Sequence, residues 1–320
     1  MTSSTPPASG PNEHWTKLWK AGVLHSCNAA MGGNYDGSIR DFWTMQFNAI
    51  GPGKSVLDLG TGNGALLLLA RETWPDLVLH GIDSAQIDPA RDMQHSRIDY
   101  RDIHFHPGCS MEAMPFADGS MQLVTSQYAF EYATLPTALA EVLRVLDPER
   151  GRIAMAIHSD HSEIAKMTAR QLQGLELIFG QLGMFDKAMR LSAGLLQKMQ
   201  GGPDNAENAR LEFNTAAQAM MSALSAPDSA PVIDKAGQLL QSALSHLPHA
   251  PAMALESLVR GREQLLHEHK RLQEMAAATY DRPRLDALIE RLRATGMQVE
   301  PGVLQQAGMT MGWTLVAHRG

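Results

Sequence analysis

An apolar run that passes into a glycine-rich turn constrains this chain more than any other feature. Residues 56–59, Val-Leu-Asp-Leu, predict a short buried strand, and Gly60, Gly62 and Gly64 follow it. Glycine lets the backbone turn sharply and lets a ligand approach without a Cβ in the way. Residues 66–72 then predict a helix whose first N–H groups point back at that ligand. The segment therefore predicts a mononucleotide-binding strand–turn–helix unit.

Two acidic residues near the turn help to decide which cofactor it binds. The glycine pattern alone also fits a loose dinucleotide fingerprint, because Ala65 stands in its last place. Asp83 ends a second predicted strand, 77–83, where a carboxylate can bind both ribose hydroxyls of either class of cofactor. Asp58 lies inside the first strand, where a dinucleotide-binding fold usually has an apolar residue. Asp58 therefore argues against a dinucleotide.

Two further segments repeat the pattern of a helix or turn that leads into a strand. Residues 110–118 lead into a predicted strand at 121–125, and residues 139–148 lead into another at 152–157. In this order the segments resemble the class I S-adenosylmethionine-dependent methyltransferases, and among them the quinone-biosynthesis C-methyltransferases, over about residues 54–158. The resemblance implies a Rossmann-like α/β fold, with a mostly parallel seven-stranded sheet and an antiparallel last strand.

The resemblance also implies which residues bind S-adenosylmethionine. Asp58 and the glycine loop would hold the amino acid part, while Asp83 would bind the ribose. Ser110 stands where the family usually has an aspartate for the adenine amino group, and Met111 would offer its backbone N–H to the ring. The cofactor-binding residues that we expect are Asp58, Gly60, Thr61, Gly62, Asn63, Gly64, Asp83, Ser84, Ser110, Met111, Gln127 and Tyr35.

The segment before the first strand is rich in aromatic residues. Trp15 and Trp19 fall at helical spacing, as do the apolar residues of 39–50, so two short helices are expected. In small-molecule methyltransferases such an N-terminal helical cap commonly closes over the cofactor, and Tyr35 or Arg40 would then contact its methionine end. The alternative is that these aromatic side chains only pack the helices onto the sheet.

A large helical insertion is expected after the fifth strand. Residues 159–279 show no convincing strand, and the apolar positions of 164–189 indicate one long first helix. Ligands of open parallel sheets bind at the carboxyl ends of the strands, so the insertion is placed to act as a lid, a homodimer interface or both. The expected parts are a disordered leader (1–11), an N-terminal helical cap (12–50), a Rossmann-like core (51–158), the insertion (159–279) and the last core helix and strands (280–320).

Candidate catalytic residues lie at the ends of the fourth and fifth strands. The polar residues after the fifth strand are His158, Asp160, His161 and Glu163. A histidine near its ordinary pKa can take a proton from a hydroxyl or amine, so His158 is the first candidate base. Tyr128 and Glu131, after the fourth strand, are the other candidates. Tyr128 could orient the substrate, and for Glu131 the alternative is that it only faces its own helix. The polar cluster could equally be a solvated loop or a capped helix start, and no metal is expected.

Overall composition restricts the class of protein. The net charge of −7 over 320 residues argues against a nucleic-acid partner. Two cysteines, no bilayer-spanning apolar stretch and no signal peptide favour a cytoplasmic protein without a membrane partner. We expect an S-adenosylmethionine-dependent methyltransferase of a small apolar or aromatic metabolite, acting on oxygen, nitrogen or carbon. The alternative is a cofactor-binding scaffold or sensor whose helical block binds a protein partner.

Overall fold

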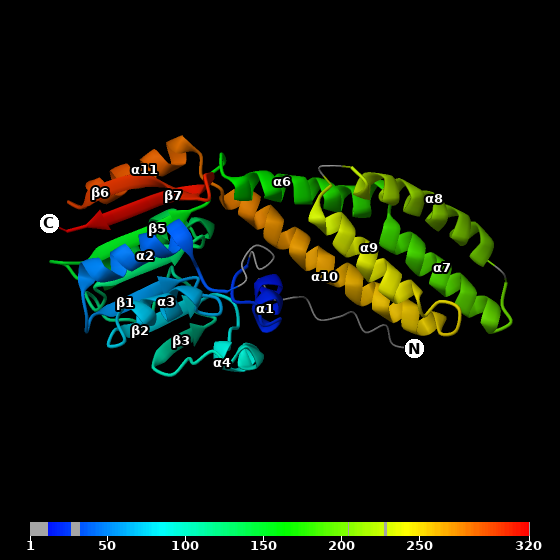
Figure 1. Cartoon of the computed structure of the whole chain (residues 1–320), viewed down its shortest axis with the longest axis horizontal. Coiled ribbons are helices and arrows are strands. Elements are labelled where there is room, and N and C mark those ends of the chain that lie inside the picture. The colour runs from blue at the N-terminus through cyan, green and yellow to red at the C-terminus, as the bar shows by residue number, and fades with distance from the viewer. Residues whose placement is uncertain (1–11, 27–32, 204, 227–228, 320) are drawn as a thin grey trace. The chain divides into compact units, whose positions relative to one another are not determined.

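The computed structural model describes residues 12–26, 33–203, 205–226 and 229–319 (Figure 1). Two compact units make up the chain, one formed by Met1–Ala165 with Ala277–Gly320 and the other by Lys166–Ala276. The second unit lies inside the range 159–279. The leader expected at 1–11 falls outside the described residues.

The first unit is built on a seven-stranded sheet with the order β3-β2-β1-β4-β5-β7-β6. The first five strands are parallel, and β7 is antiparallel to both of its neighbours, β5 and β6. This arrangement confirms the predicted fold class. The strands are β1 (Ser55–Leu59), β2 (Val78–Asp83), β3 (Ile103–Pro107), β4 (Leu123–Gln127), β5 (Arg152–Ile157), β6 (Gln298–Gln306) and β7 (Met309–His318).

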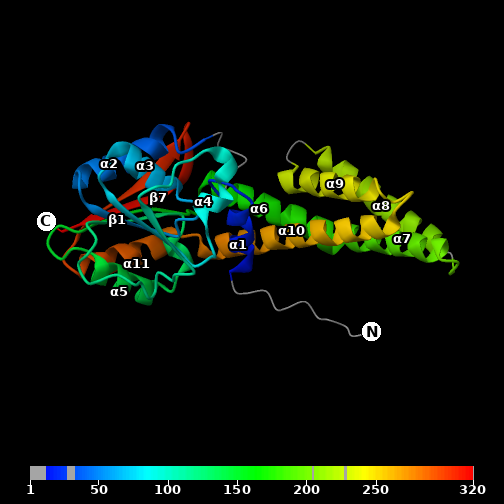
Figure 2. The same cartoon turned by 90° about the horizontal axis from the view of Figure 1, so that it is seen from below.

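Helices cover both faces of this sheet, α2 and α3 on one side and α5 and α11 on the other (Figure 2). Trp43 and Phe47 of α2 are fully buried on the first face, and Leu285 and Leu288 of α11 on the second. The apolar spacing of these helices supplies the stripe that each buries against the strands. The unit's helices are α1 (Glu13–Lys20), α2 (Gly37–Ile50), α3 (Ala65–Thr73), α4 (Pro89–Asp92), α5 (Leu135–Val145) and α11 (Arg282–Arg293).

The second unit is helical and has a core of its own, which includes Phe185, Leu240 and Leu258. Its elements are α6 (Glu163–Glu176, shared with the first unit), a π-helical turn (Leu177–Gln181), α7 (Met184–Met199), α8 (Ala206–Leu224), α9 (Pro231–Leu244) and α10 (Pro251–Ala278). The single long helix expected over 164–189 is wrong. Gly183 adopts a left-handed conformation with φ 57°, which separates α7 from the helical residues before it.

Candidate functional site

The glycine loop lies at the carboxyl end of β1, next to β4, where the strand order of the parallel sheet reverses. Such a switch point is where open α/β sheets bind their ligands. The Thr61 N–H donates to the carbonyl of Ile82 at 2.9 Å, which joins the loop to β2. Gly60 has φ 64°, and a Cβ there would lie 2.3 Å from the Cβ of Ala129. The glycine therefore serves close packing within the protein as well as a positive φ.

Asp83, at the end of β2, holds the glycine loop in place. Its Oδ2 accepts the Gly62 N–H at 2.9 Å and its Oδ1 accepts the Ala85 N–H at 2.8 Å. Burial raises the pKa of Asp83 to about 6, although these two hydrogen bonds oppose the rise. Because a carboxylate oxygen can accept two hydrogen bonds, each oxygen keeps a position for a ribose hydroxyl.

Asp58 is a second buried acid, inside β1. The Thr125 hydroxyl of β4 donates to its Oδ1 at 2.9 Å. Burial raises the pKa of Asp58 to about 7, and the nearby charge of Asp83 adds to the rise, whereas the Thr125 hydrogen bond lowers it. A cationic group of a ligand beside Asp58 would therefore favour its charged form.

The helix α1 packs directly on this loop. A Cβ on Gly62 would lie 2.6 Å from the indole ring of Trp19. The fully buried Asn63 uses its Nδ2 to bind the carbonyls of Trp19, at 3.0 Å, and Val23, at 2.7 Å. Its Oδ1 makes no hydrogen bond to any residue that the structure describes. The loop thus contains one buried acceptor without a partner among the described residues.

The segment that precedes α2 reaches the beginning of α3. Asn34 donates from Nδ2 to the carbonyl of Ala65 at 2.9 Å, which places Tyr35 beside the end of the glycine loop. Arg40, the alternative contact for the methionine end, instead forms an ion pair with Glu72 at 2.9 Å. The ring of Tyr35 packs against that of His25, 4.4 Å away, so its contact with the methionine end stays a prediction.

The residues expected along the adenosine surround the next turn. The Ser110 hydroxyl accepts the N–H of Glu112 at 3.1 Å, so it already stabilises a local turn. Ser84 is exposed, and Met111 packs against the edge of the core on the α5 face. The direct contact of these three residues with adenine or ribose stays a prediction.

The end of β4 carries two further candidates. Gln127 accepts a hydrogen bond from the indole N–H of Trp43, a residue of α2. Tyr128 has φ 56°, which is uncommon for an aromatic residue and often marks a functional site. Its hydroxyl donates to the carbonyl of Met311 at 3.1 Å, and its ring lies 4.5 Å from that of His158. Tyr128 is thus fixed at both ends of its side chain.

His158 and Glu131 form a buried pair at the carboxyl ends of β5 and β4. The Nδ1 of His158 lies 2.7 Å from Oε1 of Glu131, and the backbone N–H of His158 donates to the same oxygen at 2.8 Å. The two residues are 3% and 4% exposed. The structure contradicts the alternative in which Glu131 only faces its helix, because the turn Phe130–Tyr132 directs its carboxylate to His158. The contact between Glu131 and His158 could have been predicted from the adjacency of β4 and β5, because both residues follow the carboxyl ends of these strands.

The remaining polar residues after β5 begin a helix. The Ser162 hydroxyl accepts the N–H of Ala165 at 3.1 Å and so caps α6, as the alternative reading of this cluster predicted. The side chain of His161 is 80% exposed. Within the described ranges, no three His, Cys, Asp or Glu side chains gather closely enough to hold a metal ion.

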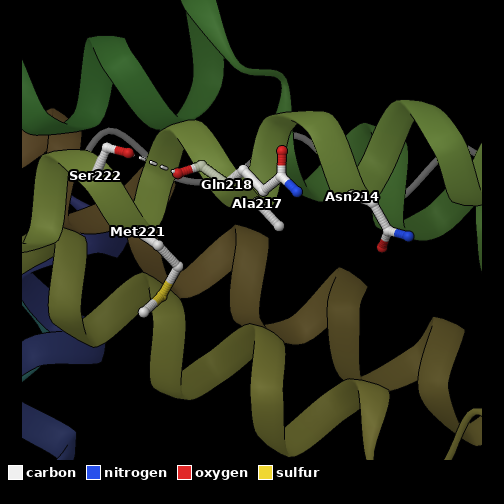
Figure 3. A pocket seen from close by; sticks show the side chains of 5 residues that line it. All are labelled: Asn214, Ala217, Gln218, Met221 and Ser222. Carbon is white, nitrogen blue, oxygen red and sulfur yellow. Dashed lines mark hydrogen bonds between the residues drawn. The ribbon is translucent and has the colours of Figure 1, made fainter.

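A hollow elsewhere on the chain offers little chemistry. It is lined by Asn214, Ala217, Gln218, Met221 and Ser222, all from α8 (Figure 3). The Ser222 hydroxyl is bound to the carbonyl of Gln218 at 3.1 Å, and no lining residue is ionisable. The candidate site is therefore the one at the carboxyl ends of β1, β2, β4 and β5. In the described part of the chain, no helix is long and apolar enough to cross a membrane.

Comparison with known proteins concerns the segment that contains the first four strands. Residues 56–149 match the family described as "Methyltransferase domain". The chain is 33% identical over 96 residues to the demethylmenaquinone methyltransferase of Thermus thermophilus. The aligned segment covers 30% of this chain and 43% of that protein. It is 30% identical over 110 residues to the ubiquinone/menaquinone biosynthesis C-methyltransferase UbiE of Legionella pneumophila, covering 33% and 44%. The chain thus spans less than half the length of these relatives.

Solved structures give more distant matches. A S-adenosylmethionine-dependent methyltransferase from Aquifex aeolicus is 19% identical with a TM-score of 0.33, covering 39% of this chain and 69% of that one. The geranyl diphosphate C-methyltransferase of Streptomyces coelicolor is 18% identical with a TM-score of 0.33, covering 48% and 67%. The sheet order, the matched segment and the motifs together define a class I methyltransferase domain. S-adenosylmethionine is the cofactor of this domain.

Proposed function

We propose that the whole protein is an S-adenosylmethionine-dependent methyltransferase that acts on a small molecule. The observation that carries the proposal is the position of Asp83, whose two oxygens each bind one backbone N–H and keep room for a second donor. The buried Oδ1 of Asn63, which lacks a partner among the described residues, also fits a loop built for a ligand. Both residues lie within the segment 56–149 that matches the family, Asn63 in the turn after β1 and Asp83 at the end of β2.

The residues present fit the cofactor part by part. Asp83 would bind the ribose hydroxyls, while Asp58 and the glycine loop would bind the amino acid part, whose ammonium group favours the charged form of Asp58. Ser84, Ser110 and Met111 would then follow the adenosine. Gln127 and Tyr35 would contact the methionine end. The bound cofactor supplies an electrophilic methyl group carried on a sulfonium.

The proposed acceptor is a small apolar or aromatic compound. Two aromatic side chains lie beside His158: the ring of Tyr128 is 4.5 Å and that of Tyr132 is 6.0 Å from its ring. Trp15 in turn packs edge-on against Tyr132 at 5.7 Å. Aromatic faces and edges favour flat apolar ligands. The names of the two relatives concern quinone methylation, so a hydroquinone is the first acceptor to test.

The test combines binding with turnover. Calorimetry with S-adenosylhomocysteine measures cofactor binding, and transfer of a labelled methyl group to 1,4-naphthohydroquinone measures activity. We expect both in the parent chain and neither in Asp83→Ala. A folded parent that does not bind the nucleotide would refute the proposal. Binding without transfer to this acceptor or to any compound of a metabolite extract would favour the scaffold or sensor alternative.

A further inference from the structure

We propose that Glu131 positions His158 as the general base of methyl transfer, by holding its Nδ1–H so that Nε2 keeps a free lone pair. This inference rests on the proposed function, and it assigns a role to a residue that the chain's motifs do not reveal. His158 would be the catalytic residue, since it would contact the acceptor. Glu131 would act only through His158 and is therefore a positioning residue.

Hydrogen bonding fixes the imidazole in one tautomer. Oε1 of Glu131 accepts a hydrogen bond from the backbone N–H of His158 at 2.8 Å. The same oxygen lies 2.7 Å from Nδ1 of the imidazole ring. An ionised carboxylate has no proton to donate, so Nδ1 must carry the hydrogen. In the neutral ring Nε2 is then the basic nitrogen, and no described residue forms a hydrogen bond with it. The backbone is held too, because the Tyr280 N–H donates to the carbonyl of His158 at 2.8 Å.

Among the described residues, His158 is the basic side chain that pairs with Glu131. Glu131 forms an ion pair with no lysine or arginine in the described residues, and its Oε2 is buried without a hydrogen bond. Burial raises the pKa of Tyr280, and the charge of Glu131 adds to the rise, so Tyr280 stays a neutral phenol. The guanidinium of Arg284 lies over the ring of Tyr280, 4.3 Å from the centre of that ring. The carboxylate of Glu131 is therefore available to hold the ring of His158 in one orientation.

Among the described residues, the other titratable side chains considered near this pair are three tyrosines and one aspartate. Tyr128 and Tyr132 present their rings to His158, and Tyr280 approaches it through its backbone. Asp160 follows on the chain, with a side chain that is 38% exposed. None of these groups carries a positive charge, so protonation of His158 meets no direct repulsion from them.

The pair also lies next to the cofactor loop. Ala129, two residues before Glu131, packs so closely on Gly60 that a Cβ on this glycine would lie 2.3 Å from its own Cβ. The turn that carries Glu131 therefore contacts the loop that is assigned to the amino acid part of the cofactor. With the cofactor bound on this loop, His158 would lie on the side of the amino acid part.

The proposed step balances in atoms and charge. The acceptor's O–H or N–H proton moves to Nε2 of His158, and the electron pair left on the acceptor forms the bond to the methyl carbon. In a hydroxyarene, this pair can react through the ring carbon instead. The methyl–sulfur bond breaks with its electron pair remaining on sulfur, which loses its positive charge. The imidazolium then releases the proton to water.

The first test reads the tautomer of His158 in the full chain. Two-dimensional ¹H–¹⁵N spectra of the histidine rings distinguish a protonated from an unprotonated nitrogen, and His158→Gln identifies the signal of His158 among 13 histidines. We expect the Nδ1–H tautomer at pH 8 in the parent. In Glu131→Gln we expect a mixture of the two tautomers, because an amide can donate a hydrogen bond to Nδ1 as well as accept one from it. Glu149→Gln is the control, since Glu149 is exposed at the opposite end of β5.

The second test is the pH profile of methyl transfer to 1,4-naphthohydroquinone. His158→Gln should lower kcat by about 10²–10⁴-fold. Glu131→Gln should lower kcat less than His158→Gln does and move the acidic limb of the profile to lower pH, because a nearby opposite charge is lost. A residue that merely supports the fold would lower the melting temperature without moving that limb.

Each outcome decides for or against the inference. An Nε2–H tautomer in the parent, or a ring protonated at both nitrogens at pH 8, would overturn it without touching cofactor binding. Unchanged pH limbs in Glu131→Gln would do the same. Failure of S-adenosylhomocysteine to bind would instead defeat the proposed function, and the tautomer would remain a property of the pair alone.

Discussion

Removal of the Asp83 carboxylate is the sharpest test of the cofactor site. Its two oxygens accept the N–H groups of Gly62 and Ala85 at 2.9 and 2.8 Å, and each keeps room for one ribose hydroxyl. A hydrogen bond to a charged group contributes about 1.5–3 kcal/mol. Loss of both ribose contacts in Asp83→Ala should therefore raise the Kd for S-adenosylhomocysteine by about 10²–10⁴-fold.

Calorimetry at pH 8 measures this change, with thermal unfolding to verify that the variant is folded. Asp41→Ala is the matched control, because Asp41 is exposed on α2. The variant should also unfold more easily, since two loop N–H groups lose their acceptor. A folded Asp83→Ala protein whose Kd stays within threefold of the parent would refute the assignment of Asp83 to the ribose.

The same site predicts a pH dependence of binding in the parent. The pKa of Asp83 is raised to about 6 in the free protein. If only the ionised form accepts both hydroxyls, roughly a tenth of the sites are competent at pH 5, and affinity should fall about tenfold between pH 8 and pH 5. An affinity that is constant over this range, or that rises toward pH 5, would contradict the assigned role.

Further predictions concern stability and the helical unit. Since the pKa of Asp58 is raised from 3.8 to about 7, the native state binds its proton more tightly than the unfolded state, and the free energy of unfolding should fall by up to about 4 kcal/mol from pH 4 to pH 8. Asp58→Asn should flatten that slope in denaturant titrations. Gly60→Ala should cost about 1–3 kcal/mol in the same assay, because of its positive φ and the 2.3 Å approach to Ala129. If residues 164–196 form a lid, cofactor plus substrate should slow their amide exchange, whereas protection that follows protein concentration would indicate a dimer.

The sequence predicted a structural feature correctly where the residues that indicate it lie within one helix or strand and the adjoining turn. The strand 56–59, the glycine turn and the acid that ends the second strand were predicted and found. The antiparallel last strand was expected from the family resemblance, and β7 has this direction. The third strand was overlooked, because Ile103–Pro107 contains two histidines at the edge of the sheet and lacks an apolar run. The break at Gly183 was missed because apolar spacing continues on both sides of it.

The sequence by itself determined the order of strands, helices and acidic residues, because hydrophobic periodicity and glycine turns act over a few neighbouring residues. Only the tertiary structure decided which side chains meet. Glu131 and His158 are separated by 27 positions and become partners because β4 and β5 lie side by side. Trp19 covers Gly62 in the same way, through the packing of α1 on a loop more than 40 residues later. Burial then raises the pKa of Asp58 and Asp83, since desolvation depends on everything packed around a group and not on its neighbours in sequence.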